Sequence, residues 1–213
     1  MVKDSLTLVI QAGGESRRMG QDKALLPFLG EPLILRVLRR LQPIADEVIV
    51  VARHPENLAL PGVRVVSDLL PGIGALGGLY TALVVARFPL VGVVACDMPF
   101  VSAGLLNEAR SRLVQTGVDA VIPRTAQGWE PLHAVYRRET CLLPVERAIQ
   151  RGERRLIAWH GEARVLALSG EDILPFDPHL RAFLNINTSE DLRLAEALAR
   201  EEEPDSAETL SEG

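Results

Sequence analysis

The sequence predicts an α/β protein with a mostly parallel central sheet, and two observations carry this prediction. Short runs of β-branched and aliphatic residues alternate along the chain with longer amphipathic segments, as in βα units whose sheet is covered by helices on both faces. The chain has 213 residues, of which 47% are hydrophobic, so it can bury a sizeable core as one domain. We find no internal repeat that would indicate a repeat architecture.

The individual elements follow from the local patterns. We expect strands at the apolar runs, which are residues 6–10, 47–52, 63–67, 91–96, 119–123, 132–136 and 163–168. We expect helices where leucine, valine and alanine recur every three or four residues, which is the case in residues 32–42, 76–87, 102–115, 140–151 and 189–202. Pro32 suits a first helical turn, and Thr188 or Ser189 suits an N-cap.

The end of the chain differs in composition from the rest. The stretch "REEEPDSAETLSEG" contains Pro204, many acidic residues and no apolar period. Such a segment cannot bury enough apolar surface to offset the entropy of ordering it. We therefore expect one domain over residues 1–203 and a disordered acidic tail over residues 204–213.

Charge and cysteine content limit the function classes that fit. A formal net charge of −5 argues against a general nucleic-acid-binding protein, but it is compatible with a local basic pocket for one phosphorylated ligand. Two isolated cysteines without a CxxC pattern indicate neither a disulfide framework nor a zinc site. No apolar run approaches the roughly 20 residues that a membrane span needs. We expect a cytoplasmic protein that binds neither nucleic acid nor membrane.

The stretch "QAGGESRRMGQDK", residues 11–23, follows the first predicted strand and combines glycines with cations. Glycines at such a turn let the backbone approach a ligand, with amide hydrogens directed at an anion. The spacing is neither the dinucleotide pattern GxGxxG nor the P-loop pattern GxxxxGK. A structural turn is the alternative, and Arg18 alone could equally be a solvated side chain. Arg17 and Lys23 favour a phosphate site, because both residue types bind phosphate oxygens.

The run "AGGESRRMGQDKALL" resembles the signature AGGxSxRMGxDKxLL of the molybdenum cofactor guanylyltransferases, within a wider nucleotidyltransferase superfamily. Four more segments resemble this family in the same order: "VSDLLPGIGALGGLYTAL" (66–83), "VVACDMPFVS" (93–102), "EPLHAVYRR" (130–138) and "FLNINTSEDL" (183–192). The resemblance implies a single three-layer, Rossmann-like domain of the nucleotide-diphospho-sugar transferase type.

The same resemblance implies transfer of GMP from GTP to the phosphate of molybdopterin, with release of pyrophosphate. The implied catalytic residues are Arg17, Lys23 and Asp97, with Asp97 as the ligand of Mg²⁺. The implied GTP-binding residues are Gln11, Ala12, Gly13, Gly14, Gly20, Lys23, Asp68, Leu76, Gly78 and Asp97. The implied molybdopterin-binding residues are Asn185 and Asn187. We expect a monomer that contacts molybdenum cofactor biosynthesis proteins or molybdoenzymes transiently.

Asp97 and Asp68 each follow a predicted strand, and ligands bind at the carboxyl ends of strands in an open α/β sheet. Asp97 could hold Mg²⁺, which prefers oxygen ligands, or it could cap the following helix near Ser102 or belong to the turn at Pro99. Asp68 could contact the nucleotide or only form the turn before Pro71 and Gly72.

Asn185 and Asn187 alternate in "LNINT", so on an extended segment both face the same way and could hydrogen-bond a pterin or its phosphate. Asn187 could instead cap the last helix. We expect His133 to be a half-buried strand residue, and Cys96 and Cys141 to be small buried residues. In "RGERR" (151–155), Arg154 or Arg155 is either part of a solvated face or a contact for an anionic pterin.

The implied chemistry needs no general base, because a phosphate monoester has a second pKa of about 6 and is mostly ionised near pH 7. Catalysis would then consist of positioning and charge neutralisation. Three other functions stay open: a CTP-dependent molybdopterin cytidylyltransferase, a sugar-phosphate nucleotidyltransferase, and a non-catalytic nucleotide- or pterin-binding partner of molybdoenzymes. The family usually has leucine where this chain has Gln11, so Gln11 bears most directly on the choice of base.

Overall fold

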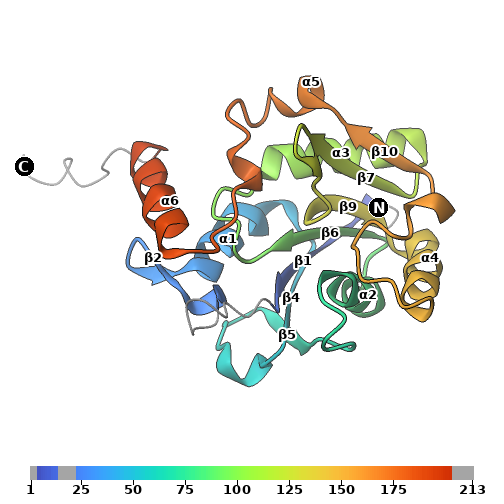
Figure 1. Cartoon of the computed structure of the whole chain (residues 1–213), viewed down its shortest axis with the longest axis horizontal. Coiled ribbons are helices and arrows are strands. Elements are labelled where there is room, and N and C mark those ends of the chain that lie inside the picture. Colours follow the sequence, from blue (N-terminus) through green and yellow to red (C-terminus); the bar gives the residue numbers. More distant parts are fainter. Residues whose placement is uncertain (1–3, 14–22, 203–213) are drawn as a thin grey trace, which may run out of the picture.

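The computed structural model describes residues 4–13 and 23–202, and its centre is an eight-stranded sheet (Figure 1). Seven strands follow one another in the order β10-β7-β9-β6-β1-β4-β5, and β8 pairs with β7. The strands of this sheet are β1 (Leu6–Ala12), β4 (Glu47–Ala52), β5 (Arg64–Ser67), β6 (Leu90–Ala95), β7 (Ala120–Thr125), β8 (Gly128–Trp129), β9 (His133–Arg137) and β10 (Val165–Leu168). The tail expected at residues 204–213 lies outside the described residues.

The sheet is mostly parallel, as predicted. β1 pairs in parallel with β4 and β6, β4 pairs in parallel with β5, and β10 pairs in parallel with β7. β9 runs antiparallel between β6 and β7. The chain reverses after β7 in a hairpin, where Gly128 has a φ of 134° and allows the tight turn. The apolar pattern of β9 resembles that of its neighbours, because a strand buried on both faces has the same composition in either direction.

All five predicted helices are present, with bounds shifted by at most two residues at either end. The helices are α1 (Leu33–Leu41), α2 (Ala75–Val85), α3 (Ala103–Thr116), α4 (Arg138–Gln150), α5 (Gly170–Ile173) and α6 (Ser189–Glu202). The short α5 was not predicted, although its sequence carries a signal: Ser169 and Asp172 form a capping box.

Several short elements lie between the main ones. The strands β2 (Pro27–Phe28) and β3 (Glu31–Pro32) form a hairpin whose turn places Leu29 and Gly30 at positive φ. The 3-10 helices are η2 (Lys23–Leu25), η3 (Gln42–Ile44), η4 (Pro55–Asn57), η5 (His160–Glu162) and η6 (Arg181–Phe183). Among them, η2 matters most for the site, because it begins at Lys23.

The molecule has three layers, and β1 shows how the sequence builds them. Leu8 and Ile10 pack into the core formed with α1 and α3, while Val9 packs into the core formed with α2 and α4. Figure 1 shows these two helix pairs on opposite sides of the sheet. Since alternate side chains of a strand point to opposite faces, the odd-numbered Gln11 lies on the α2 side.

A third, smaller core attaches the last helix to the domain. Ile186, Ala195 and Ala199 pack with Phe28 and Phe100 in this cluster. The cluster brings the segment before α6 to the loops that follow β1 and β6. Within the described ranges, no helix has both the length and the apolar character required to cross a membrane.

Candidate functional site

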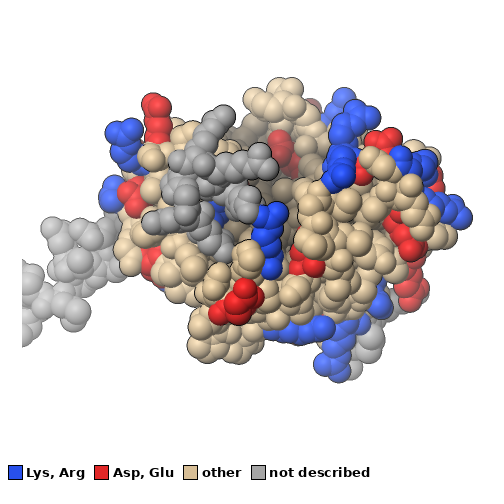
Figure 2. All heavy atoms as spheres, turned by 60° about the horizontal axis from the view of Figure 1, so that its bottom comes forward, with Lys and Arg blue, Asp and Glu red and all other residues tan. Residues whose placement is uncertain are grey.

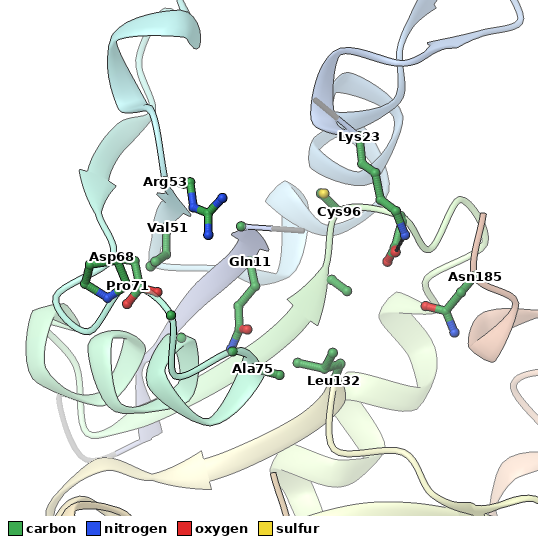
Figure 3. Close-up of a pocket in the computed structure, with 16 residues that line it drawn as sticks. Gln11, Lys23, Val51, Arg53, Asp68, Pro71, Ala75, Cys96, Leu132 and Asn185 are labelled. Atoms are coloured by element: carbon green, nitrogen blue, oxygen red, sulfur yellow. Dashed lines mark hydrogen bonds and ion pairs between the residues drawn. The ribbon is translucent and has the colours of Figure 1, made fainter. Parts of the chain in front are cut away.

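A cavity of about 410 Å³ opens at the carboxyl ends of β1, β4 and β6. Its lining includes the predicted site residues Gln11, Gly13, Lys23, Asp68, Gly78, Asp97 and Asn185 (Figure 3). These residues come from segments far apart in the sequence. Their convergence agrees with the rule that ligands bind beyond the carboxyl ends of strands in an open α/β sheet.

Lys23 joins two other predicted residues at one side of this cavity. Its Nζ lies 2.6 Å from Oδ2 of Asp97 and 2.7 Å from Oδ1 of Asn187. The side chains of Lys23 and Asp97 are only 11% and 16% exposed. The ammonium group therefore donates to a carboxylate and an amide at once, in a partly desolvated place where such contacts are stronger than in open water.

Backbone hydrogen bonds hold Asp97 on both sides. The N–H of Cys96, the residue before it, donates to the carbonyl of Gln11 at 3.0 Å. The carbonyl of Asp97 itself accepts from the N–H of Ile186 at 2.9 Å. Asp97 does not cap α3. The N-cap of this helix is Ser102, whose Oγ accepts from the N–H of Leu105 at 3.2 Å.

The segment that carries Asn187 is fixed by the start of α6. Oδ2 of Asp191 accepts from the N–H groups of Asn187 and Thr188 at 2.9 and 2.8 Å, and Thr188 Oγ1 accepts from the N–H of Asp191 at 3.1 Å. The hydrogen bond from the Asn187 N–H, followed by that from Thr188, lowers the pKa of Asp191. Thr188 is thus the N-cap, and Asn187 is free of that role.

Asn185 and Asn187 flank a buried residue, as an extended segment requires. Ile186 between them is 1% exposed, whereas both asparagines are exposed. Asn185 lines the cavity, and its Nδ2 donates to the carbonyl of Phe183 at 3.1 Å. Asn187 reaches the same region through Lys23.

Asp68 both forms a turn and lines the cavity, so the two interpretations of this residue are compatible. Its Oδ1 accepts from Thr81 Oγ1 at 2.8 Å and from the N–H of Leu70 at 3.1 Å. Gly72 and Gly74 in the following loop have φ values of 90° and 78°, which L side chains rarely adopt. The loop therefore keeps its shape through glycine conformations and the bonds of Asp68.

Gln11 and Gly78 form the floor of the cavity together. A Cβ at position 78 would lie 2.4 Å from Oε1 of Gln11, so the amide of Gln11 occupies the space that any larger residue would need. Nε2 of Gln11 is buried and has no hydrogen-bond partner among the residues the structure describes. A buried amide hydrogen without an acceptor is costly, which favours a ligand that supplies one.

Other predicted residues are not brought to the cavity lining, or cannot be placed. The side chains of Ala12 and Leu76 are buried in the core, at 3% and 0% exposure. Gly14, Arg17 and Gly20 lie outside the described residues. Cys96 is buried as expected and also lines the cavity, while Cys141 lies in the core, where burial raises the pKa of its thiol to about 12.

The expectation for His133 was wrong in degree, because this residue is completely buried. Its Nε2 accepts from the N–H of Ser102 at 3.0 Å, and its ring lies 5.6 Å from that of Phe183 in a T-shaped contact. Burial lowers the pKa of His133 to about 4, so the ring is neutral at pH 7. The residue supports the fold beside the site.

Arg53 and Leu132 are among the cavity-lining residues that the sequence reasoning missed. The signal for Arg53 was available, because it directly follows the predicted strand 47–52, in the position that singled out Asp97 and Asp68. A further link was missed in the stretch 151–155, where the Arg154 guanidinium donates to the carbonyl of Gly72, a cavity residue.

The face drawn in Figure 2 is hollowed, and its described residues form no large area of one charge. Acidic and basic side chains are interspersed over it. Within residues 4–13 and 23–202, no group of three or more His, Cys, Asp or Glu side chains is arranged to hold a metal ion. The single carboxylate of Asp97 nevertheless fits Mg²⁺, which commonly binds one or two carboxylates and takes its other oxygens from substrate phosphates and water.

Residues 8–165 match the MobA-like NTP transferase domain. The chain is 40% identical over 194 residues to a probable molybdenum cofactor guanylyltransferase of Pelotomaculum thermopropionicum, covering 91% of this chain and 93% of the relative. It is 34% identical over 195 residues to the molybdenum cofactor guanylyltransferase of Desulfosudis oleivorans, covering 91% and 96% of the two chains.

A solved structure agrees with the sequence relatives. The crystal structure of molybdopterin-guanine dinucleotide biosynthesis protein A from Archaeoglobus fulgidus matches with a TM-score of 0.81 and 31% identity, over 92% of this chain and 99% of that chain. The predicted fold class is confirmed by this likeness. The chain belongs to the family of MobA-like NTP transferase domains, whose relatives at 34–40% identity are named molybdenum cofactor guanylyltransferases.

Proposed function

We propose that this protein is a molybdenum cofactor guanylyltransferase that transfers GMP from GTP to the phosphate of molybdopterin and releases pyrophosphate. The observation that carries the proposal is the contact of Lys23 with both Asp97 and Asn187 in a cavity at the carboxyl edge of the sheet. This contact joins the residue expected to bind the triphosphate to the segment expected to bind the acceptor. The family membership supports the same activity.

The nucleotide is proposed to bind along the cavity, with its phosphates at Lys23 and Asp97 and its base toward Gln11 and Gly78. The backbone of Gly13 is proposed to support the nucleotide at the end of β1. Arg17, which lies outside the described residues, is proposed to bind the phosphates as the sequence predicts. The unpartnered Nε2 of Gln11 supports a polar contact with the base.

The reaction is a displacement at the α-phosphorus. A molybdopterin phosphate oxygen forms the new P–O bond, and the bond from the α-phosphorus to the bridging oxygen of pyrophosphate breaks. Lys23 holds the triphosphate in place and neutralises negative charge that builds on the leaving group. Mg²⁺, when bound at Asp97, would add positive charge at the same phosphates.

The acceptor is proposed to lie against Asn185 and Asn187. Asn187 Oδ1 accepts from Lys23 in the present structure, while the Nδ2 of an amide remains able to donate to a phosphate. The cap formed by Asp191 and Thr188 would keep this side chain in position. A monomeric state, a cytoplasmic location, and transient contact with molybdenum cofactor biosynthesis proteins or molybdoenzymes belong to the same proposal.

The direct test is a pyrophosphate-release assay with the purified protein, magnesium, molybdopterin and one nucleoside triphosphate at a time. Release with GTP, and not with CTP, is the expected result. Release with CTP alone would replace the proposal by the cytidylyltransferase alternative. Release only when a sugar phosphate replaces molybdopterin would support another acceptor, and nucleotide binding without any turnover would support a non-catalytic partner protein.

Asp97→Asn provides the matched test of the metal contact. The amide keeps the shape and still accepts from Lys23, but it lacks the charge that binds magnesium. We expect turnover to fall by about 100-fold or more, while GTP still binds measurably. Unchanged turnover would remove Asp97 from the metal role.

A further inference from the structure

Arg53 enters the cavity from the strand next to β1. It is the first residue after β4, and Ala52 before it pairs in register with Ala12 of β1. Arg53 therefore stands level with Gly13, where the glycine-rich loop begins. The residue is exposed and lines the cavity (Figure 3).

Arg53 and Lys23 approach the cavity from different sides. In Figure 3, Arg53 lies on the side of Asp68 and Pro71, whereas Lys23 lies on the side of Asn185. Lys23 forms an ion pair with Asp97, so the carboxylate that suits a metal lies on the same side of the cavity as Lys23. The phosphates of a nucleotide are therefore expected on that side. A nucleotide with its phosphates on that side extends its base toward Arg53 and Asp68.

Part of the cavity lining suits a planar ring. Gly74, Ala75 and Gly78 line the cavity and offer no side chain beyond a methyl group. A flat base can lie against such a surface while its edges face the polar groups around it. Arg53 then meets one edge of the base rather than its face.

We propose that Arg53 is a specificity-determining residue that binds the acceptor edge of guanine, formed by its O6 and N7 atoms. This inference rests on the proposed function and identifies the group that selects the nucleotide. Arginine has five N–H donors and no acceptor, and its fork matches O6 and N7 bidentately. Adenine places an amino donor beside N7, and cytosine also presents an amino donor, so neither offers this pair of acceptors.

The test compares nucleotide binding by Arg53→Gln, Arg53→Lys and the unchanged protein, using isothermal titration with Mg²⁺. Arg87→Gln is the control. Arg87 is an exposed arginine that precedes the amino end of β6, whereas Asp97 follows the carboxyl end of the same strand. Arg53→Gln should bind GTP about ten- to a hundred-fold more weakly, with ATP binding unchanged. Arg53→Lys should lose less affinity, because lysine can still donate to O6 and N7 but lacks the planar fork.

Two sets of analogues separate base contact from phosphate contact. The analogue 7-deaza-GTP, which lacks N7, should bind the unchanged protein more weakly than GTP, and this difference should vanish in Arg53→Gln. The loss caused by Arg53→Gln should be the same for GTP, GDP and GMP. A loss that shrinks as phosphates are removed, or that is equal for GTP, ATP and CTP, would overturn the inference.

The same titrations distinguish the two proposals. If the unchanged protein binds GTP and turns it over, but Arg53→Gln keeps its preference for GTP over ATP, only the role of Arg53 fails. If the unchanged protein neither binds nor uses GTP, the proposed function fails before Arg53 is considered. The thermal transition of each variant is measured beside the titrations, so that GTP affinities are compared only between folded proteins.

Discussion

At the scale of single residues, the ammonium group of Lys23 connects parts of the chain that are 74 and 164 residues away, at Asp97 and Asn187. Asp97 lines the cavity and Asn187 contacts Lys23 beside it, so a triphosphate that binds Lys23 must compete with both acceptors. Because the side chains of Lys23 and Asp97 are little exposed, water screens their charges weakly, and the charge of the triphosphate should decide this competition. Substitution of Lys23 should therefore weaken triphosphate binding, and it also leaves the largely buried carboxylate of Asp97 without its ion-pair partner.

Lys23→Met is expected to lower the turnover number by about 100-fold and to weaken GTP binding, because methionine keeps the length of the side chain without its charge. Steady-state kinetics and titration with GTP measure both effects. Arg193→Met, on the exposed face of α6, is the control and should leave both unchanged. Wild-type GTP affinity together with a wild-type rate would exclude Lys23 from the site.

Gly78→Ala is expected to weaken GTP binding about tenfold, because the new methyl group would displace the amide of Gln11 from the cavity floor. The thermal transition should change little, since the group that must move is the end of a flexible side chain. In a Gln11→Ala background, Gly78→Ala should cost much less affinity. A double-mutant cycle measures this coupling, and strictly additive effects would contradict it.

At the scale of elements, the start of α6 fixes the acceptor segment. The cap formed by Thr188 and Asp191 sets the backbone of Asn187, and the small core around Ile186 holds the segment against the loops after β1 and β6. Capping and packing thus position a side chain that is itself exposed. A substitution in the cap should therefore displace Asn187 while leaving the residues that line the cavity unchanged.

Thr188→Ala should reduce the free energy of unfolding by about 1 kcal/mol, as expected for loss of an N-cap. It should also raise the KM for the acceptor more than the KM for GTP, because Asn187 loses its backbone support. Thr188→Ser keeps the hydroxyl and should restore both properties. Thr116→Ala, which removes a hydroxyl at the carboxyl end of α3, is the control for stability.

At the scale of the whole molecule, the three layers leave two histidines with depressed pKa values. His133 is completely buried, and burial lowers its pKa to about 4. His160, between Trp129 and Trp159, also has its pKa lowered to about 4 by burial, although it is partly exposed. Both rings are mostly neutral in the folded protein at pH 5 and above. In the unfolded chain, histidine has a pKa of about 6.5 and is therefore mostly protonated at pH 5.

This difference predicts that stability falls as the pH decreases from about 7 toward 4. The folded-state pKa lies below the unfolded value, so the unfolded state binds more protons throughout this window. For His133 the loss amounts to about 2 kcal/mol between pH 7 and pH 5. Urea unfolding at several pH values measures it, and His133→Gln should flatten the profile. A profile for the variant as steep as that of the original protein would contradict the assignment to His133.

The sequence by itself determined the class of fold and the main strands and helices. Apolar runs and helical spacings depend on neighbouring residues, so they are readable without the tertiary structure. The rule that polar residues at strand ends form ligand sites also identified Asp97 and Asp68 correctly as cavity residues. Arg53 satisfied the same rule and was missed.

Only the tertiary structure decided which distant residues meet. The contact of Lys23 with Asn187, the fit of Gln11 against Gly78, the antiparallel direction of β9 and the complete burial of His133 all depend on how the layers pack. A local pattern fixes whether a side chain faces the core, but not what it meets there, because that partner is set by strand order and by the approach of helices from elsewhere in the chain.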